Sequence, residues 1–439
     1  MISESLELSL IQVSNRQQKH SGLSTLKRNG GSPRVSKGVW CCAKSDALPH
    51  GRASAIVEMT KNTAVRLIVL ASIIMNIGIT SYAQSDDGAL HALELTKLLK
   101  TSIVTPIIRG LQVTFVYRGR GNRVEVVGDF TNWRPRGHVL SEADGTGARH
   151  YTHTFAATAR VEYKFIVDGE WTIDPLNPQQ VNNGVGGFNS FITMPEYRPT
   201  PFADEARVER GTLLKAVMPN RGNRPARKIS VYLPHGYDGS PRRYPVLYLQ
   251  DGTDYIMRGH AVQIANNLIA RAKVKPFIIV FVDPADRIKE YWANDAFSDF
   301  VATELVPFVD ARFRTRADRD KRALLGASLG GVISVWTALR HPELFARVGG
   351  QSSAFWIDNE RVVTALAALD AAAQQKHPMR FYFDVGRLEP ILDVNRRVRA
   401  LLTEKGYAVV YRESEAGHNF TTWRDGLADA YVALWKDEL

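Results

Sequence analysis

The segment 326–331, which reads Gly-Ala-Ser-Leu-Gly-Gly, has the residue types and spacing of a nucleophile elbow. It directly follows the apolar run 323–325 and opens an amphipathic stretch over 331–339. This order of strand, sharp turn and helix presents a serine hydroxyl at the start of a helix. The helix N-terminus and the next backbone amide then face the oxygen on which negative charge develops. The pattern predicts Ser328 as a nucleophile and the Leu329 amide as an oxyanion donor.

A serine hydroxyl is a weak nucleophile and needs a base to remove its proton. Three histidines follow Ser328. His341 stands where a predicted helix stops at a proline, and His377 precedes a proline in a polar loop between a predicted helix and strand. His418 instead lies between the last predicted strand and the last predicted helix. That is where the base of an elbow hydrolase stands, in the chain order serine, acid, histidine. We therefore predict His418 as the general base.

The acid that orients this histidine should follow the preceding strand, 381–385. The candidates are Glu389, Asp393 and Asp384. Asp384 lies within the strand, and Asp393 falls on the first turn of the next helix. Glu389 lies on the loop at the carboxyl end of the strand, and we favour it for that reason.

A second oxyanion donor is expected from the loop 248–253, which follows an apolar strand and contains an Asp-Gly pair. Gly252 would let the backbone approach the site closely, so the Thr253 amide is the predicted donor. The alternative is a plain Asp-Gly turn without a catalytic role.

The elements that must position these residues fall into two domains. Strand-like apolar runs alternate with helical patterns over 213–439, which predicts an α/β-hydrolase domain with a mostly parallel sheet and helices on both faces. Short alternating strands with Gly, Asn and Asp turns fill 107–195 and predict an antiparallel β-sandwich. A Pro-rich linker covers 196–212, and a lead-in with a short helix covers 84–106.

The α/β region resembles the putative-esterase family of α/β-hydrolases, which includes enterochelin esterases, feruloyl and acetylxylan esterases, esterase D and mycolyltransferases. The matching words are Leu249-Gln-Asp-Gly252, the elbow, Gln351-Ser-Ser-Ala-Phe-Trp356, Gly386-Arg-Leu-Glu-Pro390 and Gly417-His418. The last two words are most similar to the enterochelin-esterase branch, and this similarity implies catalytic roles for Glu389 and His418. Many relatives have Asp after the catalytic histidine, where this chain has Asn419.

The β region resembles the family-48 carbohydrate-binding module. The resemblance is carried by Gly128-Asp-Phe-Thr-Asn-Trp133, Glu162-Tyr-Lys-Phe165 and Asp168-Gly-Glu-Trp171. In sugar-binding members, two tryptophans, a lysine and an asparagine hold the glucan, which implies such roles for Trp133, Lys164, Trp171 and Asn189. The alternative is a module that only packs against the catalytic domain.

The first 83 residues differ from the rest of the chain. A basic segment, the apolar run 67–79 and small residues near Ala83 predict a secretory signal peptide over 59–83, so that residues 1–58 are interpreted as an upstream over-extension. The alternative is an uncleaved anchor with a disordered cytoplasmic tail. The C-terminal Lys-Asp-Glu-Leu matches an endoplasmic-reticulum retention signal, but we interpret it as the charged end of the helix 421–435.

Composition excludes several classes of protein. Of the formal net charge of +11, six charges fall in residues 1–83, and no basic cluster that would bind nucleic acid stands out in the remainder. The two cysteines are adjacent, which excludes a disulfide scaffold and a structural zinc site, and no cofactor or metal is predicted.

The sequence therefore predicts an exported, periplasmic or secreted serine ester hydrolase that works through an acyl-enzyme. Its expected partners are sugar-linked feruloyl or acetyl esters or siderophore-type esters, with glycan possible and with no nucleic acid and no membrane after signal cleavage. The alternatives are an acyltransferase to a sugar and a non-catalytic glycan-binding protein with a decayed hydrolase domain.

Overall fold

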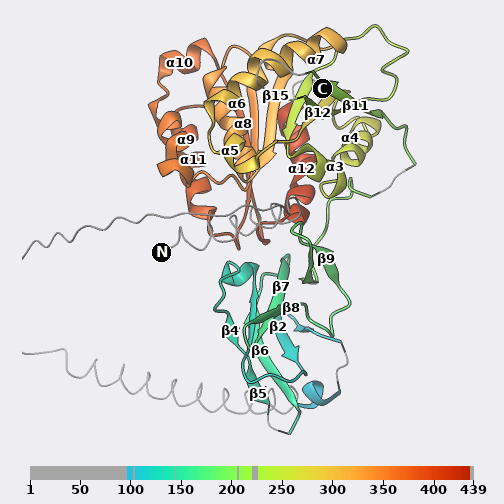
Figure 1. Ribbon diagram of the computed structural model, residues 1–439, viewed down its shortest axis with the longest axis vertical. Coiled ribbons are helices and arrows are strands. Elements are labelled where there is room, and N and C mark those ends of the chain that lie inside the picture. The colour runs from blue at the N-terminus through green and yellow to red at the C-terminus, as the bar shows by residue number, and fades with distance from the viewer. Residues whose placement is uncertain (1–95, 102–103, 144, 205–206, 220–225, 436–439) are drawn as a thin grey trace, which may run out of the picture. The chain divides into compact units, whose positions relative to one another are not determined.

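A computed structural model describes residues 96–101, 104–143, 145–204, 207–219 and 226–435. Residues 102–439 form one compact unit that contains both the β domain and the hydrolase domain (Figure 1). The predicted over-extension and signal peptide lie outside the described residues. Of the predicted lead-in helix, the described part runs from Thr96 to Thr101 and is helical.

The β domain consists of two antiparallel sheets, with strand orders β1-β2-β6-β5 and β4-β3-β7-β10-β9, and with β8 paired to β7. The strands are β1 (Ile107–Arg109), β2 (Gln112–Tyr117), β3 (Val124–Gly128), β4 (His138–Val139), β5 (Ser141–Ala143), β6 (Ala148–Thr154), β7 (Arg160–Val167), β8 (Glu170–Thr172), β9 (Gln180–Asn182) and β10 (Phe188–Thr193). A short 3-10 turn, η2 (Asp129–Thr131), follows β3.

The alternation along β7 explains how the β domain buries its core. Val161, Tyr163 and Phe165 point into a cluster that both sheets share, and Phe115 of β2 packs against Tyr163 with ring centroids 4.8 Å apart. The intervening residues of β7 point to the other face of its sheet, because successive strand side chains alternate. Lys164 therefore lies on that outer face.

The hydrolase domain is built on an eight-stranded mixed sheet in the order β11-β12-β14-β13-β15-β16-β17-β18. The six strands from β14 to β18 in this order are parallel, as the sequence predicted, whereas β11 and β12 add an antiparallel edge. The strands are β11 (Thr212–Met218), β12 (Arg227–Leu233), β13 (Val246–Gln250), β14 (Ile278–Val282), β15 (Arg322–Ala327), β16 (Arg347–Gln351), β17 (Arg380–Gly386) and β18 (Ala408–Ser414).

Helices cover both faces of this sheet (Figure 1). They are α3 (Gly252–Met257), α4 (Ala261–Ala270), α5 (Arg287–Tyr291), α6 (Asp295–Phe300), α7 (Val306–Arg312), α8 (Leu329–Arg340), α9 (Ile357–Ala368), α10 (Ala371–Lys376), α11 (Leu392–Glu404) and α12 (Phe420–Trp435). The first four residues of β13 are apolar because both faces of the strand are buried: Val246 and Tyr248 enter one core cluster, while Leu247 and Leu249 enter the other.

The segment between β10 and β11 contains no described helix or strand, yet it is tied to the hydrolase domain. The Asn267 side-chain amide donates to the carbonyls of Phe202 and Asp204 at 2.7 and 2.9 Å, and the Tyr197 hydroxyl donates to Asp425. The predicted linker is therefore anchored along much of its length. None of the helices within the described ranges is long and apolar enough to cross a membrane.

Candidate active site

Ser328 stands at the sharp turn between β15 and α8. Its backbone angles are φ 55° and ψ −120°, a conformation that is strained for a residue with a side chain. The Ser328 N–H donates to the Gln351 carbonyl at 2.8 Å, which anchors the turn to the next strand. The Ser328 hydroxyl lies at the carboxyl edge of the sheet. Among the described residues it has no hydrogen-bond partner.

The glycines of the elbow are required by close backbone approach. A Cβ on Gly326 would lie 2.4 Å from the Gly330 carbonyl oxygen, and one on Gly331 would lie 2.3 Å from the Ser353 hydroxyl. Neither position has room for a side chain. The glycines that flank Ser328 are therefore required by the close packing around this turn.

Leu329 is the first residue of α8 and is fully buried. The N–H groups of Gly331 and Val332 donate back to the Ser328 carbonyl, whereas the Leu329 N–H has no partner among the described residues. An unpaired amide in the first turn of a helix is suited to bind a developing negative charge.

Glu389 and His418 are hydrogen-bonded to each other at this edge. Glu389 Oε2 lies 2.7 Å from His418 Nδ1, and its Oε1 accepts from the Ser352 hydroxyl at 2.6 Å and from the Gly386 N–H at 2.7 Å. The Glu389 side chain is 0% exposed, whereas that of His418 is 34% exposed. This arrangement fixes the imidazole through Nδ1 and leaves Nε2 available to a substrate or nucleophile.

Ser352 and Trp423 support this pair and were given no catalytic role from the sequence. The Ser352 hydroxyl accepts from Trp423 Nε1 at 2.9 Å while it donates to Glu389. The Trp423 ring stands edge-on to the His418 ring, with centroids 5.0 Å apart. Ser352 belongs to the Gln-Ser-Ser word noted in the sequence, and this word is the only signal that could have pointed to it.

The alternative acids have other surroundings. Asp384 Oδ2 accepts from Gln351 Nε2 at 2.7 Å and from the Tyr382 hydroxyl at 2.8 Å, and burial raises the pKa of its carboxyl to about 7. Asp393 is exposed in the first turn of α11. Of the three candidates, Glu389 is the one that is hydrogen-bonded to His418.

The residue after His418 has a local role. The Asn419 side-chain oxygen accepts from the Thr422 N–H at 3.1 Å and so caps the start of α12. Asp and Asn cap helices about equally well, which accounts for the difference from relatives that have Asp here. The two other histidines considered for the base, His341 and His377, end α8 and α10.

The predicted second oxyanion donor is not free in this structure. The Thr253 N–H donates to Asp283 Oδ1 at 2.8 Å, and the Thr253 hydroxyl donates to Asp283 Oδ2 at 2.6 Å. The role of Thr253 therefore stays a prediction that requires this bond to open.

The same loop is tied to the elbow by an ion pair. Arg287 donates twice to the Asp251 carboxylate, at 2.9 Å from both Nε and Nη2, and its Nη2 also lies 3.4 Å from the Ala327 carbonyl. A bidentate guanidinium–carboxylate pair has a fixed geometry. It fixes the distance between the loop 248–253 and the elbow.

The four residues predicted to bind glycan differ in how free they are. Trp171 is 44% exposed and Lys164 is half-buried. Trp133 Nε1 donates to Asp129 at 2.9 Å, and the buried Asn189 side-chain amide donates to Glu162 at 2.8 Å. Of the four residues, Trp133 and Asn189 therefore already use their side-chain N–H groups in hydrogen bonds within the β domain.

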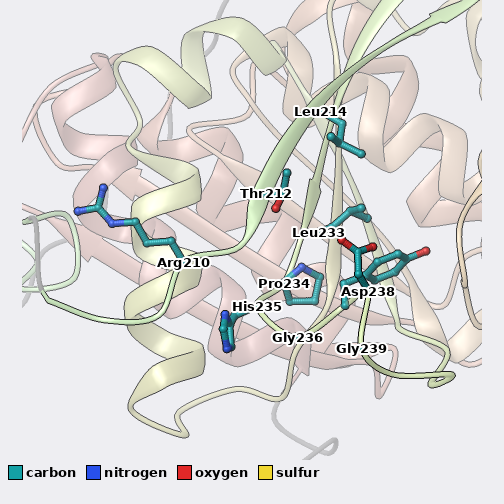
Figure 2. A pocket seen from close by; sticks show the side chains of 10 residues that line it. Arg210, Thr212, Leu214, Leu233, Pro234, His235, Gly236, Asp238 and Gly239 are labelled. Atoms are coloured by element: carbon teal, nitrogen blue, oxygen red, sulfur yellow. The ribbon is translucent and has the colours of Figure 1, made fainter.

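Figure 2 shows a cavity of about 210 Å³ at the end of β12, lined among others by Thr212, Leu233 and Asp238. Because β12 runs antiparallel to β14, this end lies at the amino ends of the parallel strands, at the edge opposite to Ser328. It is separate from the candidate site. In the part of the chain that the structure describes, no group of His, Cys, Asp and Glu could hold a metal ion.

Comparison with known proteins identifies both domains. Residues 223–434 match the family described as putative esterase, and residues 111–198 match the glycogen recognition site of AMP-activated protein kinase. An endo-1,4-beta-xylanase/feruloyl esterase of Xylanibacter ruminicola is 28% identical over 290 residues, which are 62% of this chain and 38% of that protein. The chain thus spans well under half of the length of this relative.

The iron(III) enterobactin esterase of Escherichia coli K12 is 26% identical over 272 residues, which are 60% of this chain and 67% of that protein. The crystal structure of the enterobactin esterase of Shigella flexneri, determined in the presence of enterobactin, aligns with a TM-score of 0.63 at 22% identity, over 75% of this chain and 94% of that one. This likeness establishes the α/β-hydrolase-like fold. The chain belongs to the putative esterase family and carries an N-terminal domain of the glycogen-recognition type.

Proposed function

We propose that this protein is a serine carboxylic-ester hydrolase that works through an acyl-enzyme. The observation that carries the proposal is the buried Glu389 carboxylate bonded to His418 Nδ1 at 2.7 Å, at the sheet edge that also bears the Ser328 turn. His418 Nε2 removes the Ser328 proton as Oγ attacks the ester carbonyl carbon. The same nitrogen then returns the proton to the departing alkoxide, and water deacylates the enzyme by the reverse sequence.

Negative charge develops on the carbonyl oxygen in both steps, and backbone donors stabilise it. The Leu329 amide is one donor. We assign the second to Thr253, whose N–H becomes available when it leaves Asp283. Opening of this bond would couple substrate arrival to completion of the site.

The proposed substrates are feruloyl or acetyl esters of sugars, or siderophore-type esters. Support comes from the named activities of the two relatives and from the glycogen-recognition match of the β domain. Glycan binding through Trp171 and Lys164 is part of the proposal, since these two side chains are at least partly exposed.

Export is also proposed, on the signal-peptide pattern of residues 59–83. N-terminal sequencing of the exported protein should begin at Gln84. Recovery of residues before Met59 from the mature protein would contradict both the signal peptide and the interpretation of 1–58.

The test of function is a panel of esters given to the purified protein: p-nitrophenyl acetate, methyl ferulate, acetylated xylan and ferric enterobactin. We expect hydrolysis of at least one by the wild type, with no turnover by Ser328→Ala. Trapping of a covalent acyl group on Ser328 by mass spectrometry would establish the intermediate. Absence of hydrolysis across the panel would contradict the proposal.

A further inference from the structure

The loops that carry the acid and the base both contact the β domain. The Arg160 N–H of β7 donates to the Glu415 carbonyl at 3.0 Å, three residues before His418. Leu388, which directly precedes Glu389, packs against the β-domain core cluster. The β domain therefore touches both halves of the Glu389–His418 pair through their neighbours in the chain.

Asp129 lies directly against Gly417. A Cβ on Gly417 would lie 2.1 Å from Cγ and 2.2 Å from Oδ1 of Asp129. The carboxyl group thus rests directly on the backbone that leads into His418, at a distance that no side chain at position 417 would permit. Asp129 itself is 3% exposed.

Asp129 is held rigidly from its own side. Its Oδ1 accepts from Trp133 Nε1 at 2.9 Å and its Oδ2 accepts from the Glu162 N–H at 2.8 Å. The Glu162 side chain is in turn buried between Arg160, at 2.8 Å, and Asn189, at 2.8 Å. Both carboxyl oxygens are satisfied, so the group has a fixed orientation against Gly417.

The charges around this carboxyl favour its neutral form. Burial and the nearby Glu162 carboxylate raise the pKa of Asp129 to about 7, against the lowering effects of the Glu162 amide, Trp133 and Arg160. The contact that the Asp129 carboxyl makes with this loop is with the Gly417 backbone. Its effect on His418 is therefore through the position of the backbone.

We propose that Asp129 is a positioning residue of the active site, which supports the Gly417 backbone and so keeps His418 aligned with Glu389 and Ser328. The inference rests on the proposed function. It makes the β domain a structural part of the catalytic centre, whatever it binds on its exposed face. A misplacement of about 1 Å in a catalytic group costs about 100-fold in rate, so small movements of this loop should be measurable.

The experiment compares Asp129→Ala with Asp174→Ala in the full chain. Asp174 is the matched control, because it is also a buried β-domain aspartate, bonded to the Tyr163 hydroxyl at 2.6 Å and to the Thr105 hydroxyl at 2.9 Å. Its hydrogen-bond partners Thr105, Tyr163, Ser190 and Leu176 all lie outside the hydrolase domain. Circular dichroism first establishes a temperature at which both variants are folded.

For Asp129→Ala we expect kcat to fall about 10- to 100-fold, with KM within about threefold of wild type. Asp129→Asn keeps the shape and one acceptor and should recover most of this loss. Asp174→Ala should leave kcat within about twofold of wild type. The second readout is the far-downfield proton NMR signal of the His418 Nδ1–H, which should shift or vanish in Asp129→Ala and persist in Asp174→Ala.

An unchanged kcat and an unshifted resonance in folded Asp129→Ala would overturn the inference, as would equal losses in the two alanine variants. If Asp129→Ala does not fold, Gly417→Ala replaces it, since the added methyl must push the loop away from Asp129 and should give the same two changes. A wild-type protein that hydrolyses no ester would contradict the proposed function. The NMR comparison would still decide whether Asp129 positions His418.

Discussion

The two halves of the candidate site are assembled in different ways. The nucleophile half is local: six consecutive residues make the turn at Ser328, and glycine contacts within the turn fix its shape. The acid–base half is distributed, since Glu389 and His418 are 29 residues apart and depend on Ser352, Trp423 and the β domain. Local geometry can be recognised in the sequence, whereas distributed support emerges only when the chain is folded.

The largest expected effect comes from breaking the local half. Ser328→Ala should lower kcat by about 10⁴- to 10⁶-fold, because no other group in the turn can form the acyl-enzyme. The measurement is kcat on p-nitrophenyl acetate, with thermal unfolding as the control for folding. Residual turnover within tenfold of wild type would show that another residue is the nucleophile.

Breaking the acid should have the next largest effect. Glu389→Gln should lower kcat by about two to four orders of magnitude with KM little changed, because an amide can hold the wrong imidazole tautomer. Asp393→Asn is the matched control and should cost little, since Asp393 is exposed. A larger loss of activity from Asp393→Asn would indicate that Asp393, one helical turn further along the chain, is the acid.

Ser352→Ala tests whether the distributed half depends on its supports. The change leaves Glu389 Oε1 with one donor fewer and leaves the Trp423 indole N–H without an acceptor. We expect kcat to fall about tenfold and the free energy of unfolding to fall by about 1–3 kcal/mol. Ser352→Thr, which retains the hydroxyl, should keep more of the activity, and equal activity in all three proteins would mean that this contact is dispensable.

Asp384 is expected to affect stability more than catalysis. Its folded-state pKa of about 7 lies above the ordinary value of 3.8, so the folded protein retains a proton that the unfolded chain releases. The resulting stabilisation is complete below about pH 4 and is lost as pH rises through 7. Between pH 5 and pH 8, the free energy of unfolding should therefore fall more in wild type than in Asp384→Asn, by about 1–3 kcal/mol. Parallel pH profiles for the two proteins would contradict this burial effect.

The smallest effect on catalysis is expected at the exposed face of the β domain. Trp171→Ala should leave turnover of p-nitrophenyl acetate within about twofold while weakening retention on a glucan or xylan column, since aromatic side chains stack on sugar rings. Trp171 is substituted rather than Trp133 because the Trp133 indole N–H is already bonded to Asp129. If the wild type is not retained, glycan binding is excluded and the domain is left with its positioning role.

The fold was largely predictable because its signals are periodic. Strand β14 is a continuous apolar run, β13 and β15 contain shorter apolar runs, and β7 alternates, so both sheet types could be expected. The short strands β1, β4, β8 and β9 have only two or three residues each and carry no detectable period. Their pairing comes from neighbours in the sheet.

The candidate site was predictable where a motif or chain order applies. Glu389 lies beside His418 because a loop at the carboxyl end of one parallel strand meets the loop that follows the next strand. The occupied amide of Thr253 could not be foreseen, since its acceptor Asp283 lies 30 residues away on another loop. The contact of Asp129 with Gly417 crosses two domains and has no sequence signature.

The edge-on contact between Trp423 and His418 also makes the active site observable by light. The emission of an indole depends on the groups that it touches, so the fluorescence of Trp423 should change when a substitution or a bound molecule moves the His418 ring. The chain has eight tryptophans, and the difference between wild type and Trp423→Phe isolates this one. The protein therefore contains its own optical probe of the position of the His418 ring, and this probe can be read before any substrate is known.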